Sequence, residues 1–543
     1  MDSSSKFSSR RAFLGGAASF VSLFPALGGA RAAAAAVAQG SAFMQGVAEA
    51  AARDRALAAF YKANGYQAIW TGRSAAGRAR RNALLKAVSA ADDHGLPASA
   101  YDTQLLRANL RKVRSERDLG HVEVALSQLF LRYAQDVQSG VLTPSRVDRE
   151  IARKAPRRDR LTTLTNFSKS SPGAYLRALP PATPEYTRLM KHKLAMEKVL
   201  ARGGWGPKVP GRKIRPGDSG AQVVALRNRL IAMGFMRRSA SATFDVNLQK
   251  AVQRFQLAHG LNPDGVAGAG TLKALNTSPE RRLASIIVAM ERERWLNFPR
   301  GERHIWVNLA AFTAEVIDNG KPTFRTRAVV GAAAEDRRSP EFSDEMEYMV
   351  INPTWNVPRS IAIKEYLPLM QKDPYAAGQL QVLDANGQDV DRASVDFTQY
   401  DETTFPFDLK QPPSRRNALG LVKFMFPNRF NIYLHDTPAK NLFGRDRRAY
   451  SHGCIRLRDP FEFAYTLLAR QTRNPKQFFQ AQLATGVEQI VELKRHVPVH
   501  LVYRTAFTSP RGEINFRGDI YGRDRRIFAA LQNAGVELRA VRG

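Results

Sequence analysis

The sequence predicts a multidomain α+β protein, with a helical N-terminal part and a C-terminal part built on a mostly antiparallel β-sandwich. Residues 42–204 place apolar side chains three and four positions apart, as amphipathic helices do. Short segments between residues 304 and 516 instead alternate apolar and polar positions or carry β-branched residues. Between these patterns, residues 205–215 are rich in Gly, Pro and basic residues, as linkers are. A chain of 543 residues is long enough for two to four domains.

The helical part, residues 42–204, is expected to form a scaffold. Its helical segments are Val47–Tyr61, Ala79–Ala91, Val122–Gln138 and Glu185–Leu200. In the third of these, Leu126, Phe130 and Tyr133 fall along one face. No residue pattern here points to chemistry, so formation of a hydrophobic core is the expected role.

A small all-helical module is predicted over residues 215–276. Its three helices are expected at Ala221–Met233, Asn247–His259 and Ala269–Leu275. Asp264 and Gly265 are typical of a tight turn between the second and third helices.

A helix over Glu280–Trp295 is expected to lead into the β-rich part. Strands are predicted at His304–Asn308, Thr313–Asp318, Thr326–Val330, Met346–Ile351, Phe430–Leu434, Val497–Tyr503 and Glu513–Phe516. Asn319 followed by Gly320 favours a hairpin turn.

Residues 363–416 form a polar stretch without a strand long enough to join this sheet. Long segments of this kind in a folded domain are usually lids or binding loops. Tyr366, Tyr375 and Tyr400 are candidates for stacking on a substrate, with surface packing as the alternative.

The chemistry-bearing stretch runs from Tyr433 to Pro460 and contains Cys454, the single cysteine of the chain. His452 lies two residues before it, and His435 lies upstream. A cysteine attacks a carbonyl carbon as the thiolate, so it needs a nearby base or positive charge. The alternative is a buried structural cysteine, because free Cys is among the residues most often buried.

The N-terminus carries Arg10 and Arg11 ahead of a short apolar run from Phe13 to Leu27. This pattern resembles a twin-arginine export signal, predicted over residues 1–38, with an uncleaved membrane anchor as the alternative. Structural cysteines in an oxidising compartment usually come in pairs. Export of a chain with one cysteine therefore favours a catalytic role for Cys454.

The H-D-T segment at His435 and the S-H-G-C-I-R segment at Ser451 together resemble the signature of the YkuD family of L,D-transpeptidases. These are cysteine enzymes that cross-link peptidoglycan. The resemblance covers residues 285–526, which leaves 527–543 as a C-terminal tail. It is nearer to the long members of the family. Their capping subdomain would correspond to residues 363–416. The module at 215–276 resembles a peptidoglycan-binding domain through its G-D-S-G, F-Q and D-G-V-x-G elements.

The resemblance also implies roles for individual residues. Cys454 would be the nucleophile, and His435 its general base, oriented by a backbone carbonyl next in the chain. The turn of His452, Gly453 and Cys454, with Ser451 before it, would supply backbone N–H groups for the oxyanion. The substrate would meet residues of the same stretch, namely Arg456, Asp436 and Tyr450. Many relatives have Asn in place of Arg456, which sets this chain apart from them.

The expected function is therefore a periplasmic L,D-transpeptidase that forms 3→3 cross-links through a cysteine acyl-enzyme with release of D-alanine. No cofactor or metal is expected. Its partners would be peptidoglycan stem peptides and glycan, with cell wall synthases as candidates. The formal net charge of +33 suits an anionic wall polymer or membrane surface, or serves solubility. Nucleic acid is not expected, because no nucleic-acid motif accompanies the spread basic residues.

Three other functions remain open from the sequence. A wall cysteine peptidase, acting as an L,D-carboxypeptidase, would use the same dyad with water as the acceptor. A metalloprotein would use His435, His452 and Cys454 as ligands, although no carboxylate or fourth ligand has the spacing usual in zinc sites. A non-catalytic wall-binding scaffold would carry an inactive domain, against which the intact S-H-G-C-I-R motif argues.

Overall fold

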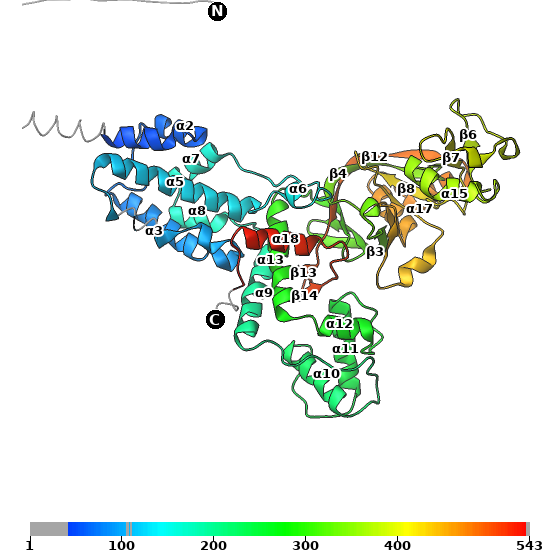
Figure 1. Ribbon diagram of the computed structural model, residues 1–543, viewed down its shortest axis with the longest axis horizontal. Coiled ribbons are helices and arrows are strands. Elements are labelled where there is room, and N and C mark those ends of the chain that lie inside the picture. Colours follow the sequence, from blue (N-terminus) through cyan, green and yellow to red (C-terminus); the bar gives the residue numbers. More distant parts are fainter. Residues whose placement is uncertain (1–41, 105–107, 109–110, 539–543) are drawn as a thin grey trace, which may run out of the picture.

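A computed structural model describes residues 42–104, 108 and 111–538. The predicted twin-arginine signal and the alternative anchor lie outside the described residues. Figure 1 shows three arms: the N-terminal helices, the small helical module, and the β-rich domain, which meet around helices α9, α13 and α18. Within the described ranges, no helix is both long enough and apolar enough to cross a membrane.

The first arm is helical, as predicted. After a helix over residues 42–51, its helices are α2 (Arg55–Ala63), α3 (Ala75–Ser89), η1 (Ala91–His94), η2 (Ala98–Ala100), α5 (Glu116–Ser139), α6 (Pro144–Val147), α7 (Arg160–Lys169), α8 (Pro172–Ala178) and α9 (Pro184–Ala201). The prediction of a single helix at Val47–Tyr61 is wrong, because the first helix ends at residue 51 and a new helix, α2, begins at Arg55. Asp54 caps the new helix by accepting hydrogen bonds from the backbone of Ala56 and Leu57.

A buried aromatic cluster holds this arm together. The ring of Trp70 stacks on that of Phe167, with 5.1 Å between centroids, and Phe167 stacks on Phe130 at 4.2 Å. Beside them lies the fully buried carboxylate of Glu123, which accepts hydrogen bonds from the backbone N–H groups of Ile69, Trp70 and Thr71. These bonds satisfy a charge that burial would otherwise destabilise.

The second arm is the three-helix module, with α10 (Ala221–Ala232), α11 (Val246–Ala258) and α12 (Ala269–Leu275). The predicted helices agree with these bounds to within one residue. The side-chain amide of Gln256 joins the turn to the helices: Nε2 donates to Asp264 Oδ1 at 2.7 Å, and Oε1 accepts from the backbone of Gly265 at 2.9 Å. Gly265 has a φ of +76°, which fits the predicted turn.

The centre of the molecule is a helical layer made from distant parts of the chain. Helix α13 (Pro279–Trp295) packs against α9 and against α18 (Arg523–Asn533), sharing one buried cluster with both. The C-terminal segment beyond residue 526 is therefore not a plain tail, because Ile527 and Leu531 are buried in this layer. A hairpin of β13 (Ala506–Thr508) and β14 (Ile514–Phe516) lies beside it, apart from the main sheet.

The third arm is built on a nine-stranded sheet in the order β10-β3-β11-β9-β8-β4-β12-β1-β2. Its strands are β1 (Arg303–Asn308), β2 (Thr313–Asp318), β3 (Lys321–Gly331), β4 (Phe342–Ile351), β8 (Val422–Met425), β9 (Leu434–His435), β10 (Ala449–Ser451), β11 (Ile455–Leu457) and β12 (Gln489–Val502). β3 also pairs with β2, which closes the sheet on itself.

The expectation of a β-sandwich is therefore wrong, because the sheet closes on itself, although most of its strand pairings are antiparallel, as expected. The sheet is mixed, because β1 pairs with β12, β9 with β11 and β3 with β10 in parallel. It is barrel-like, because β3 also pairs with β2. The sheet closes into a barrel because β3 is long. Its first residues pair with β2 and its last with β11 and β10, so one long strand joins two edges that would otherwise stay open.

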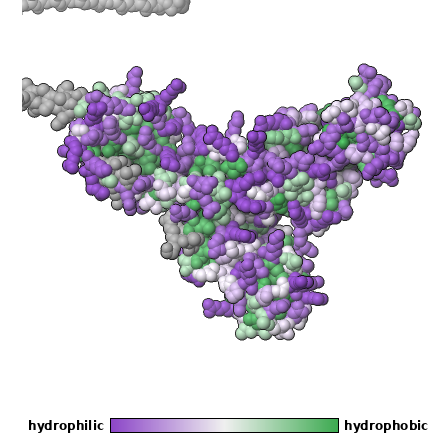
Figure 2. All heavy atoms as spheres, viewed as in Figure 1, coloured by the Kyte–Doolittle hydropathy of each residue, from purple (hydrophilic) through white to green (hydrophobic). Residues whose placement is uncertain are grey.

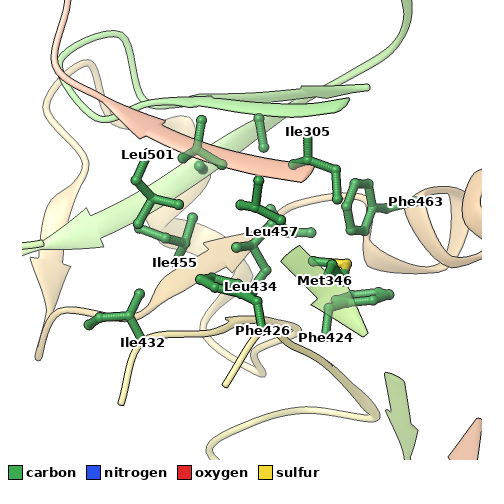
Figure 3. Packing of buried hydrophobic residues seen from close by; sticks show 14 of the residues in the cluster. Ile305, Met346, Phe424, Phe426, Ile432, Leu434, Ile455, Leu457, Phe463 and Leu501 are labelled. Atoms are coloured by element: carbon green, nitrogen blue, oxygen red, sulfur yellow. The ribbon is translucent and has the colours of Figure 1, made fainter. Parts of the chain in front are cut away.

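The interior of the closed sheet is apolar. Figure 3 shows Ile305, Leu434, Leu457 and Leu501 directed toward one another from four different strands. Helices α16 (Pro460–Leu468) and α17 (Pro475–Ala484) cover the sheet, and the Phe463 ring of α16 meets the Phe424 ring edge-on at 4.8 Å. This packing fixes β9 and β11, the two strands that carry the candidate catalytic residues.

The strand predicted at Phe430–Leu434 is wrong in most of its length, since β9 comprises Leu434 and His435. Before it, the side chain of Asn428 accepts hydrogen bonds from the backbone of Phe430 and Ile432 and donates to the carbonyl of Ile432. Asn431 then adopts a φ of +52°. A side chain thus takes the place of a neighbouring strand, and the apolar residues form a turn.

The insertion into this domain has its own core and a separate three-stranded sheet in the order β5-β7-β6. Its elements are β5 (Trp355–Asn356), α14 (Arg359–Ile361), the π-helical turn η4 (Ala362–Tyr366), α15 (Leu367–Met370), β6 (Gln381–Leu383), η5 (Arg392–Ser394), η6 (Phe397–Gln399) and β7 (Asp408–Gln411). Two 3-10 turns outside it are η3 (Glu335–Arg337) and η7 (Lys440–Gly444). The core of the insertion extends from Trp355 to Leu419, beyond the predicted bounds of 363–416.

Hydrophilic residues cover most of the visible face, with scattered apolar patches on each arm (Figure 2). This surface agrees with the high content of Lys and Arg in the chain.

Candidate active site

The candidate nucleophile lies in a sharp turn between β10 and β11. The Oγ of Ser451 donates a hydrogen bond to the carbonyl of Cys454 at 2.6 Å and accepts one from the backbone N–H of Gly453 at 3.2 Å. Gly453 has a φ of +117°, and a Cβ there would lie 3.0 Å from Ile432. The positive φ favours glycine in the turn, and a side chain there would also have to displace the end of the Ile432 side chain.

The loop between β3 and β4 holds this turn from behind. The fully buried Ser339 donates from Oγ to the carbonyl of Gly453 at 2.5 Å, and its Oγ accepts from the backbone of Gly331 at 2.9 Å. The carbonyl of Ser339 in turn accepts from Arg523 of α18 at 2.9 Å. Arg523 also donates to Glu150 of the helical arm at 2.9 Å, so the central layer supports the turn through Ser339.

Cys454 is half-buried in a cavity of about 460 Å³, which it shares with His435, Arg456 and Tyr433. Its thiol donates a hydrogen bond to the carbonyl of Asn431, with 3.6 Å between sulfur and oxygen. Burial raises the pKa of the thiol to about 11, although hydrogen bonds from Tyr433 and the charge of Arg456 oppose this shift. The thiol is therefore protonated at neutral pH.

His435 is the last residue of β9 and is 4% exposed. Burial, followed by the charge of Arg456, lowers the pKa of its imidazole to about 3, so the ring is neutral at neutral pH. The backbone of Asp436 and Leu419 opposes this shift, but no described residue forms a well-formed hydrogen bond with Nδ1. The parallel pairing of β9 with β11 sets His435 beside Arg456.

The imidazole of His452 is engaged elsewhere. Its Nε2 lies 2.6 Å from Oε1 of Glu365, which belongs to η4 in the insertion. The same carboxylate oxygen accepts a hydrogen bond from Arg337 at 2.7 Å. Both histidines near Cys454 in sequence line the cavity, but His435 is buried, whereas His452 is partly exposed.

The backbone N–H groups of the turn differ in their availability. That of Gly453 is bonded to Ser451, as described above. Across the residues that the structure describes, no acceptor is bonded to the backbone N–H of His452 or Cys454. These two groups are therefore the ones available to a ligand.

The three residues expected to meet substrate have different surroundings. Arg456 lines the cavity, where its Nε is buried and has no hydrogen-bond partner among the described residues. Asp436 is buried outside the cavity, where it accepts from the backbone of Leu421 at 2.9 Å and from Lys440 at 2.5 Å. Tyr450 is exposed on the surface and accepts a hydrogen bond from Arg445 at 3.0 Å. The structure therefore brings Arg456, but not Asp436 or Tyr450, to the thiol.

The insertion forms one wall of the cavity, as a lid would. Trp355 and Tyr366 line it from the insertion, while Phe430 lines it from the barrel side. Tyr375 and Tyr400 do not line it: Tyr375 is 61% exposed, and Tyr400 packs on aromatic rings inside the insertion.

Sequence reasoning missed three residues that contact the turn or the thiol. Tyr433 lies two positions before His435, and this spacing along an extended segment was an available signal for a shared face. Ser339 and Glu365 are far from the motif in the chain and carry no local signal.

Two further findings concern other candidate sites. Within the described ranges, no group of three His, Cys, Asp or Glu side chains is arranged to hold a metal ion. A larger cavity of about 680 Å³ lies between α9, the three-helix module and the β13–β14 hairpin, and Met196, Trp205, Phe235 and Phe516 line it.

Comparison with known families matches three segments of the chain. Residues 302–480 match the "L,D-transpeptidase catalytic domain" (YkuD), residues 219–275 match the "Putative peptidoglycan binding domain", and residues 55–192 match the "Scaffold domain".

A "Putative L,D-transpeptidase" from Haemophilus influenzae is 33% identical over 261 residues, which are 47% of this chain. The match spans 52% of that relative, so the chain covers about half of its length. Crystal structures of L,D-transpeptidases from Xylanimonas cellulosilytica and Stackebrandtia nassauensis align with 55% of this chain and with 100% and 97% of their own. Their identities are 15% and 14% and their TM-scores 0.16 and 0.21, too low to support a conclusion on the fold.

The catalytic-domain match contains Cys454 and His435 together with the insertion above them, and the module match contains helices α10 to α12. The chain thus carries a segment that matches the YkuD L,D-transpeptidase catalytic domain and, beside it, a segment that matches a putative peptidoglycan binding domain.

Proposed function

We propose that the protein is a peptidoglycan L,D-transpeptidase that forms 3→3 cross-links through an acyl-enzyme on Cys454. The observation that carries this proposal is the shared cavity, which holds a thiol, a buried neutral imidazole and the guanidinium of Arg456 under an insertion. A neutral imidazole is the form that can accept a proton from the thiol.

In the first step, Cys454 Sγ attacks the carbonyl that joins the third residue of a tetrapeptide stem to its terminal D-alanine. A C–S bond forms, and the thiol proton passes to His435. The oxygen of the tetrahedral intermediate is stabilised by the backbone N–H groups of His452 and Cys454, since that of Gly453 is already bonded to Ser451.

The intermediate collapses as the C–N bond breaks. His435 returns the proton to the departing amine, and D-alanine leaves a thioester on Cys454. The amine of a neighbouring stem then attacks the thioester, gives up a proton to His435 and regenerates the thiol. In this cycle Arg456 binds a substrate carboxylate, because its positively charged side chain lines the same cavity as the thiol.

His435, rather than His452, is proposed as the base. His435 is a buried strand-end residue that lines the cavity, whereas the imidazole of His452 contacts Glu365. Replacing His435 with Ala should slow acylation by about 10²–10⁴-fold, the usual contribution of a general base. If His452→Ala instead slowed acylation by this factor and His435→Ala acylated at the normal rate, the base would be His452.

We propose that the protein acts at the cell wall. The peptidoglycan-binding domain supports attachment to glycan and stem peptides, and cell wall synthases are proposed partners. A wall substrate requires a location outside the cytoplasm, which we propose to be the periplasm, reached through the twin-arginine pathway.

The test is incubation with purified tetrapeptide muropeptides and mass analysis of the products. Cross-linked dimers with loss of D-alanine are expected, while conversion of tetrapeptides to tripeptides without dimers would indicate the wall carboxypeptidase instead. Cys454→Ala should be folded and inactive in the same assay, and chelators should have no effect. Full activity of Cys454→Ala would refute the cysteine mechanism.

A further inference from the structure

The cavity of about 680 Å³ lies where α9, the three-helix module and the β13–β14 hairpin meet. Aromatic rings line it from three sides: Trp205 from the segment after α9, Phe235 and His259 from the module, and Phe516 from the hairpin. The rings of His259 and Phe516 stack across the junction, with 5.9 Å between their centroids. Different parts of the chain thus form the walls, as is common for ligand sites at domain junctions.

Hydrogen bonds hold the module against the rest of the protein. Arg517, the residue after β14, donates from Nη1 to the carbonyl of Ala258 at 2.9 Å. The backbone N–H of Asn262 donates to Oδ1 of Asp446 in the catalytic domain at 3.0 Å. These contacts fix the module beside the hairpin, so the walls of the cavity keep a defined arrangement.

A buried cation lines this cavity without an opposite charge. Arg282 of α13 is 7% exposed, and no carboxylate of the described residues forms an ion pair with it. Its guanidinium lies 4.5 Å from the ring centroid of Phe516 and, within the described ranges, forms a single hydrogen bond, from Nη2 to the carbonyl of Ala274. Burial lowers the pKa of this side chain to about 9, which leaves it charged at neutral pH. An anionic group bound in the cavity would compensate this charge.

The remaining polar groups of the cavity are few. Arg254 of α11 is a second cation, at an exposed position. Glu513 is the one carboxylate among the lining residues; it is exposed, and its Oε2 accepts a hydrogen bond from Ser509 at 3.4 Å. Asn515 of the hairpin also lines the cavity. Positive charge therefore exceeds negative charge in a lining that is otherwise mostly apolar.

This combination fits a saccharide that carries N-acetyl groups and a carboxylate. The C–H faces of sugar rings pack against the faces of aromatic rings, and the methyl of an N-acetyl group suits an apolar wall. A carboxylate is the usual partner of a guanidinium. A fatty acid would also bring a carboxylate, but its chain would leave the polar side chains of the hairpin without partners. One wall of the cavity lies in residues 219–275, which match the putative peptidoglycan binding domain.

We propose that this cavity binds the glycan of peptidoglycan, as an N-acetylated saccharide whose carboxylate meets Arg282. The carboxylate belongs either to the peptide stem or to the lactyl group of a muramic acid that has lost its stem. This inference rests on the proposed function, because that function makes peptidoglycan the substrate. The site is separate from the cavity of Cys454, with which it shares no lining residue.

The binding test uses the whole chain with Cys454→Ala, so that no turnover occurs. Calorimetric titrations compare a disaccharide tetrapeptide, the muramyl disaccharide without a stem, and chitobiose, which has N-acetyl groups but no carboxylate. The tighter of the two acidic probes should bind at least about tenfold more tightly than chitobiose, as expected for a charge-assisted hydrogen bond, and it identifies the source of the carboxylate. Equal affinity for all three probes, or no binding of any, would overturn the proposal.

A steric block locates the site. Ala195 of α9 is exposed and lines the cavity, so Ala195→Trp should fill part of it and weaken binding of the tighter probe at least about tenfold. The matched control is Ala201→Trp, at an exposed alanine of the same helix outside the lining, which should bind like the parent. Unchanged binding in folded Ala195→Trp would refute this location.

A charge substitution tests the role of Arg282. Arg282→Leu should bind the acidic probes no better than chitobiose, and it should remain folded, because it removes a buried charge that has no partner. Lys250→Gln, which removes an exposed cation of α11 outside the lining, should keep the preference for the acidic probe. A preference that persists in Arg282→Leu would contradict the assigned contact.

Two further measurements separate this inference from its rivals. Laurate is the probe for a lipid site, and binding of laurate without binding of either acidic saccharide would overturn the proposal. If the wild type forms no cross-linked dimers, the proposed function fails, yet saccharide binding that is lost in Ala195→Trp would still establish this site. Cross-linking by a protein that binds none of the saccharides in this cavity would refute the inference alone.

Discussion

The resting dyad is predicted to be a neutral thiol beside a neutral imidazole, rather than a thiolate–imidazolium pair. Burial raises the pKa of Cys454 to about 11, and burial with the charge of Arg456 lowers the pKa of His435 to about 3. Both shifts disfavour transfer of the proton before substrate binds. Alkylation of the free enzyme by neutral iodoacetamide measures this directly, because the thiolate is the reacting species.

The magnitude follows from the raised pKa of the thiol. At pH 7.5, a pKa of about 11 leaves about one thiol in 3,000 ionised, compared with about one in 30 at an ordinary pKa near 9. A more basic thiolate is more nucleophilic, which returns about a factor of ten of this hundredfold deficit. Cys454 should therefore react about tenfold more slowly than free cysteine at pH 7.5.

The assay follows the alkylation rate by mass spectrometry from pH 5 to pH 10. The rate should rise about tenfold for each pH unit, with no step near pH 6 or 7, because His435 does not titrate there. Arg456→Met should lower the rate further, since the guanidinium lowers the pKa of the thiol and its removal raises it. A rate that is already at a plateau between pH 5 and pH 8 would mean a preformed ion pair and refute this reasoning.

Three other predictions concern the framework around the site. Glu123→Ala leaves several buried N–H groups without an acceptor and should lower the unfolding free energy by about 3–5 kcal/mol in urea titrations, whereas an effect below about 1 kcal/mol would contradict the role given to this carboxylate. Ser339→Ala removes the bond to the carbonyl of Gly453 and should lower kcat about tenfold; an unchanged kcat in a folded variant would show that the turn needs no support from behind. Burial lowers the pKa of His500 to about 4, below the unfolded value near 6.5, so its contribution to stability is complete above pH 6.5 and falls by about 3 kcal/mol as the pH drops to 4. The difference in unfolding free energy between wild type and His500→Gln should change with pH in this window, and a constant difference would argue against a buried neutral ring.

Much of the local structure was determined by the sequence itself. Helix α12 and strand β2 begin and end where periodicity and alternation place them, because a helix and a hairpin next to Asn319 and Gly320 depend on interactions close in the chain. The S-H-G-C segment likewise carries its own turn, since Ser451, Gly453 and Cys454 bond to one another within four residues.

Local signals were insufficient where side chains or helix ends compete with a pattern. The apolar run from Phe430 to Leu434 had the composition of a strand, yet the side chain of Asn428 takes up its backbone N–H groups and turns the chain. The segment after residue 526 had no motif, yet it packs as α18 because α13 leaves an apolar face for Ile527 and Leu531. In both cases the local structure depends on a particular contact, which the composition of the segment does not reveal.

The tertiary structure alone decided how the candidate site is assembled. The parallel pairing of β9 with β11 brings His435 into the cavity of Cys454, and closure of the sheet through β3 lets Ser339 reach Gly453 from a separate loop. Glu365 reaches His452 across 87 positions of sequence. These contacts depend on which strands pair and in which direction, and this choice is set by the packing of the whole barrel, so a reading of one segment at a time cannot supply it.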